Sequence, residues 1–274
     1  RYYFVYSSVK GHELCYAVSD RPDEGYTYGG VVVDNADIFE GDPNRQEGVM
    51  AQGNNHGGIE EANGQWYVFY HRQTDRGSFS RQACAEKIFF DSQGRIRQAE
   101  ITSCGLNDGP LAGEGVYPAN ICCHLSQGGK TTFSHPMAMG ENFPYLTQDE
   151  KDITPEDVGF PESARRDAAF PVQFVRNFKD QSIMGFKYFD CRGLKRAGLT
   201  LRGKAEGTIV VSTVPMTAEN SDPAAVIGEI SVDVNTEQWT TVSGEVNLAD
   251  GVWALYFTGK GLTGPLDIAQ IELG

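Results

Sequence analysis

The chain has 274 residues, a formal net charge of -14 and a sequence pI near 4.8. This acidity argues against nucleic acid and anionic membrane surfaces as partners, because like charges repel, and it favours a neutral or cationic ligand. No apolar run approaches the ~20 residues of a membrane span, no signal peptide is recognisable, and at roughly 150 residues per domain the length predicts two domains.

The first third of the chain predicts short β-strands separated by turns. Runs of apolar and β-branched residues are bounded there by glycine, proline and polar residues. Asn63-Gly64, which lies between two such runs, is a strong signal for a β-hairpin. The expected strands are residues 2–8, 14–19, 26–33, 58–62, 65–71, 80–90 and 95–101.

An internal repeat organises these strands. Residues 3–6 (YFVY) resemble residues 67–70 (YVFY), and a repeated meander of about four short strands is typical of a propeller blade. Closure takes at least four blades, and this part of the chain supplies about two. Either the repeat is accidental, or further blades lie in polypeptide upstream of Arg1. The chain begins directly with a strand-like run, which favours the second alternative.

A change of composition separates this part from a second β unit. Residues 136–169 are rich in proline and acidic residues, which predicts a surface linker with one helical turn beginning at Thr154. We therefore expect blades over 1–135, a linker over 136–169, and a jelly-roll type β-sandwich over 170–274. The strands expected in the sandwich are residues 184–190, 196–203, 208–213, 229–234, 239–246, 252–259 and 265–273.

The six cysteines are too scattered for a disulfide scaffold, and no two of them form a CxxC pair. We interpret them as buried free thiols that serve as small apolar residues. Cys84 with Cys104 is the pair to examine first for a disulfide.

The stretch Gly53-Asn54-Asn55-His56-Gly57-Gly58 predicts a site at the end of a strand. Glycines on both sides permit a tight turn and a close approach to a ligand or another strand. In the strand that follows, His71 and Arg72 lie on opposite faces, so at most one of them faces a pocket at this end. We favour His71.

Several spaced motifs together resemble a known family. Residues 2–8, 12–17, 53–57, 66–72 and 79–82 look like the C-terminal part of a family 43 glycoside hydrolase, in the arabinofuranosidase and xylosidase branch. The tail, from residues 185–190 through Trp239 to residues 254–257, resembles a family 6 carbohydrate-binding module. The resemblance implies an all-β chain, part of a five-bladed β-propeller followed by the β-sandwich, from a secreted or periplasmic enzyme.

The activity that the resemblance implies is inverting hydrolysis of α-L-arabinofuranosyl or β-D-xylosyl units on arabinoxylan-type polysaccharide. Inversion needs one carboxylic acid and one carboxylate with room for water between them. The family's acid, base and pKa-modulating carboxyl groups are expected in a missing N-terminal propeller segment, so no catalytic residue is identified in this chain. We interpret Asp37, Glu60, Glu61 and Glu86 as solvated or structural.

Five residues are candidates for the rest of the site. By resemblance, His56 lies beside a bound calcium whose other ligands are mostly water, whereas the residue type alone favours a buried histidine. Arg81 matches an arginine of the sugar pocket; the alternative is a surface arginine. Asn54 and Asn55 either line the pocket or hold a turn. His71 is the fifth candidate.

The sandwich departs from its family, which leaves a second hypothesis open. The segment 264–269 before the last strand has neither asparagine nor tryptophan, and Trp239 and Trp253 lie within strand patterns that favour core packing. We expect the domain to brace the propeller. The alternative function is a non-catalytic carbohydrate-binding or structural fragment of such an enzyme.

Overall fold

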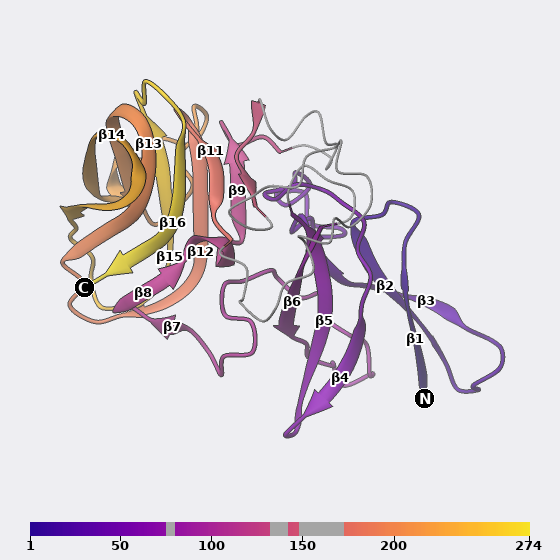
Figure 1. The fold of residues 1–274 in the computed structure, drawn as a ribbon. Coiled ribbons are helices and arrows are strands. Elements are labelled where there is room, and N and C mark those ends of the chain that lie inside the picture. Colours follow the sequence, from indigo (N-terminus) through magenta and orange to yellow (C-terminus); the bar gives the residue numbers. More distant parts are fainter. Residues whose placement is uncertain (75–79, 132–141, 148–172) are drawn as a thin grey trace, which may run out of the picture.

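A computed structural model describes residues 1–74, 80–131, 142–147 and 173–274 (Figure 1). Over these residues the fold is all-β, as predicted, and no helix within them is long and apolar enough to cross a membrane. The strands are β1 Tyr2–Ser7, β2 Glu13–Ser19, β3 Thr27–Asp34, β4 Gly58–Ala62, β5 Gln65–Gln73, β6 Arg81–Lys87, β7 Leu111–Ala112, β8 Gly115–Pro118, β9 His124–Gln127, β10 Tyr145–Leu146, β11 Val175–Phe178, β12 Ser182–Cys191, β13 Arg196–Ser212, β14 Val226–Glu245, β15 Gly251–Lys260 and β16 Leu266–Leu273. Short 3-10 turns, η1 Ala119–Ile121 and η3 Pro223–Ala225, accompany them.

The N-terminal part consists of two antiparallel three-stranded meanders, β1-β2-β3 and β4-β5-β6. They correspond to the two halves of the predicted repeat. Between β4 and β5, Asn63 and Gly64 both have positive φ angles, 53° and 81°, as a two-residue hairpin loop requires. The predicted hairpin is therefore confirmed.

The inner faces of the two meanders pack together through aromatic rings. Tyr16 is fully buried, and the ring of Phe90 lies 5.5 Å from that of Tyr3 and 5.6 Å from that of Trp66. Gly29 lies against Tyr16 so closely that a Cβ atom there would come within 2.1 Å of its ring. A side chain at residue 29 would therefore displace the tyrosine from the core.

The prediction of a strand over residues 95–101 is wrong. The segment makes only isolated bridges, because its backbone is divided between β3 and the residues that follow β6. Arg97 donates to the carbonyl of Phe89 at 3.0 Å, whereas Ala99 donates to Val32 at 2.8 Å. A residue run that alternates between partners cannot form a continuous ladder with either of them.

The C-terminal part is a sandwich built by two long bent strands, β13 and β14. The first half of β13 pairs with β16 and its second half pairs with β15, while β14 follows β13 along its length. The bend lies at Gly203 and Gly207, whose φ angles of 138° and 142° favour glycine. The strands predicted over 196–203 and 208–213 are thus one continuous strand, β13. In the same way, those predicted over 229–234 and 239–246 are both part of β14.

The core of the sandwich lies between the two layers that these bent strands and their partners form, and it is rich in phenylalanine. Phe178, Phe186, Phe189 and Phe257 have no exposed surface, and the rings of Phe186 and Phe257 meet edge to face at 6.0 Å. Burying each such side chain contributes about 1.5–3 kcal/mol. This core gives the sandwich its own source of stability.

Strands from the middle of the chain complete the sandwich. β7 and β9 pair with β12, and β8 pairs with β16, so the magenta strands of Figure 1 lie against the orange and yellow ones. Residues 111–127, which fall in the range predicted for the blades, therefore hydrogen-bond to the sandwich. Most of the predicted linker 136–169, with the turn at Thr154, lies outside the described residues.

All six cysteines are free, as expected, and Cys84 and Cys104 are not bonded to each other. The expectation that the thiols are buried holds for four of them, whereas Cys84 and Cys104 are only partly buried. The Cys84 thiol contacts the carbonyl of Gln82, while that of Cys104 contacts the carbonyls of Lys187 and Tyr188. The cysteines contribute as packed thiols.

A buried cation joins the sandwich to the meanders. The ammonium of Lys187, on β12, lies 2.9 Å from Asp37 and 2.8 Å from Glu100, and Lys187 is 7% exposed. Although burial opposes its charge, the two carboxylates hold the pKa of Lys187 above its ordinary value. Arg45 also pairs with Asp37, at 2.5 Å.

The substitution Lys187→Met tests this junction. It leaves Asp37 and Glu100 without their ammonium partner, and removing one member of a buried pair costs about 3–5 kcal/mol. We expect a loss of that order in the free energy of unfolding, measured by urea denaturation. Lys260→Met, which removes an exposed pair with Glu229, is the control and costs less than about 1 kcal/mol. Equal effects of the two substitutions would contradict the assignment.

Candidate functional site

Four of the five predicted site residues meet at one end of the β4-β5-β6 meander. His56 comes just before β4, His71 lies near the end of β5, and Arg81 begins β6. The antiparallel register, with Gly58 opposite Phe69 and Gln73 opposite Arg81, brings these ends together. The side chain of Asn54 joins them through Arg81.

The two histidines form a direct pair. Nδ1 of His56 lies 3.0 Å from Nε2 of His71, and their rings are 5.2 Å apart. Burial lowers the pKa of His71, and the charge of Arg81 lowers it further. His71 is therefore neutral at pH 7, so its ring nitrogens offer one donor and one acceptor.

His71 also carries an unused polar atom. Its Nδ1 is buried and has no hydrogen-bond partner among the residues that the structure describes. A buried polar atom without a partner costs about 1–3 kcal/mol, so an additional polar group at this position would stabilise the site.

Arg81 is oriented from two sides. One terminal nitrogen, Nη1, donates to the carbonyl of Ser80 at 2.8 Å, and the other, Nη2, donates to Oδ1 of Asn54 at 2.7 Å. These contacts use two of the five N–H donors of the guanidinium. Within the described residues no carboxylate pairs with it, so three donors are free to bind an acceptor.

Asn55 lies apart from this group, because its side chain is fully buried in the opposite direction. Its Nδ2 donates to the carbonyl of His12 at 3.2 Å, and its backbone N–H donates to Gly11 at 2.7 Å. Asn55 thus ties the site loop to the turn between β1 and β2. Of the two roles left open by the sequence, the structure favours holding the turn.

Gly57 explains why the loop can lie against β5. A Cβ atom there would come within 2.0 Å of the carbonyl oxygen of Phe69. Only glycine allows the backbone to approach this closely and still present His56 at the strand end.

Arg72 faces away from the candidate site, as strand alternation requires. It is buried, and its guanidinium donates to the carbonyls of Cys122 and Asn120, both at 2.6 Å. The preference for His71 as the pocket residue is consistent with this geometry. Arg72 instead ties β5 to the segment around η1.

The four carboxylates interpreted from the sequence as solvated or structural do not bond to this group. Asp37 pairs with Lys187 and Arg45, and Glu86 binds Thr102. Glu60 and Glu61 are exposed on β4. The candidate site, as far as it is described, consists of imidazoles, an amide and a guanidinium.

A second cluster, His12 with Glu13 and Asp34, was not predicted. Its ligand-type atoms lie within 4.8 Å of one another and all three residues are buried. Nδ1 of His12 lies 2.8 Å from Asp34, which raises the pKa of His12, and Lys10 pairs with Glu13 at 2.6 Å. These polar groups satisfy one another, so the cluster is a closed network rather than an open metal site.

The described residues do not by themselves form a calcium site. Calcium takes about six to eight oxygen ligands. Next to His56, the amide oxygen of Asn54 is already bound to Arg81, and His56 itself is paired with His71. We therefore assign no step of a mechanism to calcium.

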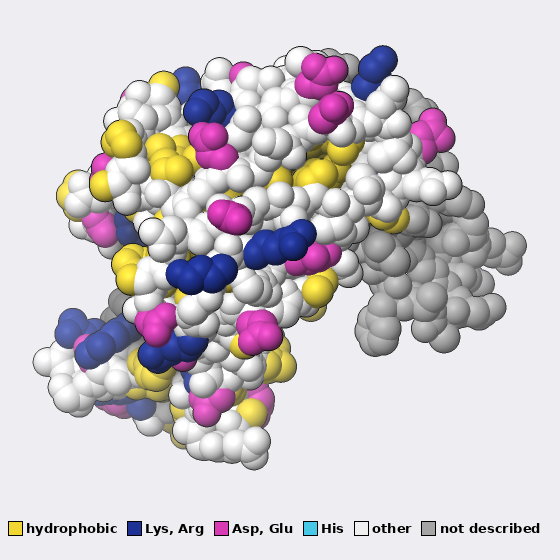
Figure 2. Space-filling view, turned by 90° about the vertical axis from the view of Figure 1, so that its left-hand side faces the viewer, with side chains coloured by type: hydrophobic (Ala, Val, Ile, Leu, Met, Phe, Trp, Pro, Cys, Tyr) yellow, Lys and Arg dark blue, Asp and Glu magenta, His cyan; other side chains and the backbone are white. Residues whose placement is uncertain are grey.

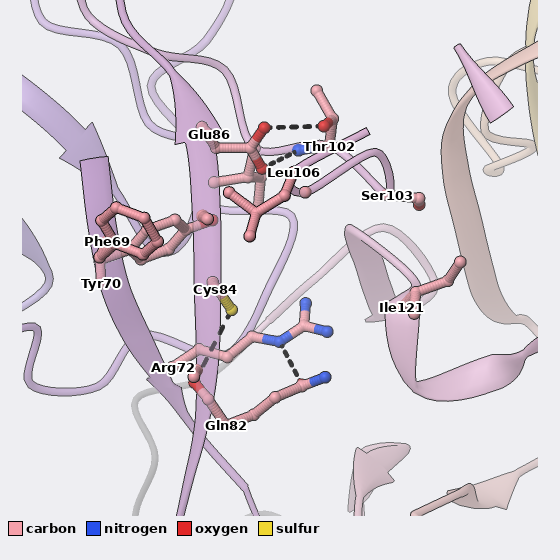
Figure 3. A pocket seen from close by; sticks show the side chains of 14 residues that line it. Phe69, Tyr70, Arg72, Gln82, Cys84, Glu86, Thr102, Ser103, Leu106 and Ile121 are labelled. Atoms are coloured by element: carbon pink, nitrogen blue, oxygen red, sulfur yellow. Dashed lines mark hydrogen bonds between the residues drawn. The ribbon is translucent and has the colours of Figure 1, made fainter. Parts of the chain in front are cut away.

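A cavity of about 350 Å³ lies beside β6 (Figure 3). Its apolar wall includes Phe69, Leu106 and Ile121, and Glu86 extends into it from β6. Both oxygens of Glu86 bind Thr102, at 2.6 Å to its backbone N–H and at 2.7 Å to its hydroxyl. Burial raises the pKa of Glu86 to about 8, although these bonds oppose the shift. Glu86 is therefore largely protonated at pH 7.

A wider groove, of about 650 Å³, lies on the sandwich and is lined by Tyr145, Arg176, Arg202 and Asp267 among others. Arg202 stacks 4.3 Å above the ring of Trp239 and donates to Asp267 at 3.0 Å. Trp239 is thus half-buried beneath a guanidinium, and it is not an open platform. On the face seen in Figure 2, acidic and basic side chains are interspersed.

The pH dependence of stability tests the protonated state of Glu86. Its folded-state pKa of about 8 lies above the ordinary 4.5, so the stability contributed by its proton is complete at low pH and is lost as the pH rises toward about 8. Glu86→Gln keeps the bonds to Thr102 without that titration. We expect the stability of the parent chain relative to Glu86→Gln, measured by urea denaturation, to fall between pH 5 and pH 8. A difference that does not change with pH would refute the assignment; Glu61→Gln is the exposed control.

Known proteins that are similar to this chain include a xylosidase/arabinosidase and a β-xylosidase. No protein-family model matches the chain. It is 43% identical to a xylosidase/arabinosidase from Thermoclostridium stercorarium over 263 residues, which cover 95% of this chain and 51% of that protein. It is 31% identical to a β-xylosidase from Xylanibacter ruminicola over 99 residues, 35% of this chain and 27% of that one.

Two solved structures show more distant likeness. A family 43 arabinoxylan arabinofuranohydrolase from Bacillus subtilis is 16% identical, with 99% of this chain and 51% of that chain covered at a TM-score of 0.47. The module CsCBM6-3 from Clostridium stercorarium is 11% identical, with 61% and 98% covered at a TM-score of 0.41. The chain spans about half the length of the first relative and about a quarter of the second. Over nearly its whole length the chain is thus a relative of a xylosidase/arabinosidase, the branch of enzymes that its motifs resemble.

Proposed function

We propose that this chain is the C-terminal portion of an inverting glycoside hydrolase that removes α-L-arabinofuranosyl or β-D-xylosyl units from arabinoxylan-type polysaccharide. In this proposal β1-β3 and β4-β6 belong to two blades of a five-bladed propeller, and the sandwich braces them. The catalytic carboxylates come from polypeptide outside these residues. The observation that carries the proposal is the convergence of Asn54, His56, His71 and Arg81 at one end of a meander.

Each of these side chains has a role in binding a neutral sugar. Arg81 offers donors to sugar hydroxyls or to a catalytic carboxylate, and Asn54 fixes its orientation. A guanidinium close to a carboxylate lowers the pKa of that carboxylate, which suits a general base. Neutral His71 exchanges hydrogen bonds with a hydroxyl group without adding charge.

The inverting mechanism determines which groups the polypeptide outside this chain must supply. An acid and a base about 6.5–9.5 Å apart must lie on opposite sides of the scissile bond. The described part of the candidate site has no carboxylate to fill either position. A polymeric plant substrate is consistent with a secreted or periplasmic enzyme, and calcium beside His56 remains an expectation of the resemblance.

The alternative is a non-catalytic fragment that binds carbohydrate or braces a partner. The observation that favours it is the same lack of a carboxylate at the described site. A decisive comparison is hydrolysis of nitrophenyl arabinofuranoside and nitrophenyl xyloside, together with the intact mass of the active species. Activity in a polypeptide larger than these 274 residues is expected, and the ratio of the two rates identifies the sugar. If every form of the protein is inactive, the proposed hydrolase is refuted and the non-catalytic fragment is the function that stands.

Arg81→Met in the active polypeptide tests the site. Loss of a positioned charged donor is expected to lower kcat/KM by about 10²–10³-fold, because such donors contribute most in the transition state. The control is Arg192→Met, which removes an exposed arginine paired with Asp190 on the sandwich. Unchanged kcat/KM for Arg81→Met, with the stability of the variant retained, would contradict the assigned role.

A further inference from the structure

The histidine pair of the candidate site offers nitrogen ligands, which suit a metal ion other than calcium. Nδ1 of His56 lies 3.0 Å from Nε2 of His71, and the His56 ring is exposed whereas that of His71 is partly buried. Calcium prefers oxygen ligands, but imidazole nitrogen suits Ni²⁺, Cu²⁺ and Zn²⁺. The donor set therefore disagrees with the calcium that the family resemblance implies, and it agrees with a divalent transition metal.

The separation of the two nitrogens indicates which coordination geometry the pair fits. The bond from an imidazole nitrogen to Zn²⁺ is about 2.0–2.1 Å long, and we take the same length for Ni²⁺ and Cu²⁺. Two such ligands at a right angle lie about 2.8–3.0 Å apart, and at the tetrahedral angle they lie about 3.3–3.4 Å apart. The observed 3.0 Å matches the right angle, which is typical of square-planar and octahedral sites.

Both rings can present a lone pair at these nitrogens without losing another hydrogen bond. A neutral imidazole carries its proton on one nitrogen and a lone pair on the other. With Nε2 of His71 bound to a metal, the proton lies on Nδ1, which has no partner among the described residues in either tautomer. The proton of His56 then lies on Nε2 of an exposed ring, where water accepts it. The ion therefore replaces only the contact between the two rings.

We propose that His56 and His71 form a binding site for a divalent transition metal of the Ni²⁺ or Cu²⁺ type, held by Nδ1 of His56 and Nε2 of His71, with water at the other positions. Both ligands belong to the described chain, so the site does not depend on the proposed function. The positive charge of Arg81 acts on His71 and opposes a cation there. Removal of that charge is expected to strengthen binding.

One consequence of the site rests on the proposed function. In the active polypeptide His71 is proposed to bind a sugar hydroxyl, and a metal ion on Nε2 occupies the nitrogen that faces His56. The ion and the sugar then compete for the same end of the β4-β5-β6 meander. Ni²⁺ is therefore expected to inhibit hydrolysis competitively.

Calorimetric titration of the 274-residue chain with Ni²⁺ tests the site. Ni²⁺ is the probe because, unlike Cu²⁺, it does not oxidise the free thiols. We expect one ion per chain, and His56→Gln and His71→Gln each weaken binding at least about tenfold, the smallest loss typical even for an outer partner of a metal ligand. Arg81→Met keeps both ligands and binds more tightly. Glu61→Gln, which removes an exposed carboxylate of β4, is the control and binds as the parent does.

NMR of the chain labelled with ¹⁵N-histidine gives a second readout that needs no variant. Paramagnetic Ni²⁺ is expected to broaden the ring resonances of His56 and His71 below one equivalent. The ring of His124, buried in the sandwich and bonded to Ser126 at 2.8 Å, stays sharp.

Three results would overturn the proposal. Binding that both histidine variants retain would show an adventitious ion only, and so would broadening that does not begin at His56 and His71. Ca²⁺ that binds the pair as tightly as Ni²⁺ would show that oxygen ligands dominate the site. A polypeptide that binds Ni²⁺ at the pair and hydrolyses neither nitrophenyl glycoside would refute the proposed function and leave this inference standing.

Discussion

The Lys187 ammonium is the interaction on which the arrangement of the two halves depends. A cation buried between β12 and the segments that carry Asp37 and Glu100 is stable only while both carboxylates remain in place. Its partners therefore hold the sandwich against the meanders in one position. Arg72 adds a second connection, from β5 to the carbonyls of Cys122 and Asn120.

These connections also stabilise the candidate site, because one of them anchors β5. Arg72 and His71 are adjacent and face opposite ways, so the bonds that anchor Arg72 also fix the backbone that presents His71. On the other side of the site, Asn55 ties the loop of His56 to the turn between β1 and β2. The imidazole pair and Arg81 are thus held by buried neighbours, which is how a binding site keeps its geometry without a ligand.

Local sequence signals predicted much of this fold. The Asn63-Gly64 turn and the glycines around His56 specify backbone conformations directly, so the hairpin and the site loop followed from residue type. The merging of the two halves of β13 was not predictable, because a glycine within a strand pattern indicates a bend or a break equally well. In β14 the polar run 235–238 resembles a turn, and only its pairing with β13 shows that the strand continues. The failure at 95–101 has another cause, since that backbone bonds both to Phe89, eight residues before Arg97, and to Val32 of β3, and a sequence pattern does not show such a division.

The site was predictable in its members but not in all their contacts. Residue type and motif selected Asn54, His56, His71 and Arg81, whereas only the structure shows that Asn55 faces the other way. The state of Glu86 was also beyond sequence reasoning, because it depends on burial against Thr102, 16 residues away in the chain. The sequence pattern indicates which side chains share a face of a strand. Their contacts depend on packing between segments that are distant in the sequence.

The most direct measurement is a crystal structure of the natural gene product bound to arabinose- or xylose-based oligosaccharide. We expect a sugar ring within hydrogen-bonding distance of Arg81 and His71, with the acid and base supplied by residues outside these 274. A sugar bound elsewhere, with the end of the β4-β5-β6 meander covered by protein and closed to solvent, would contradict it.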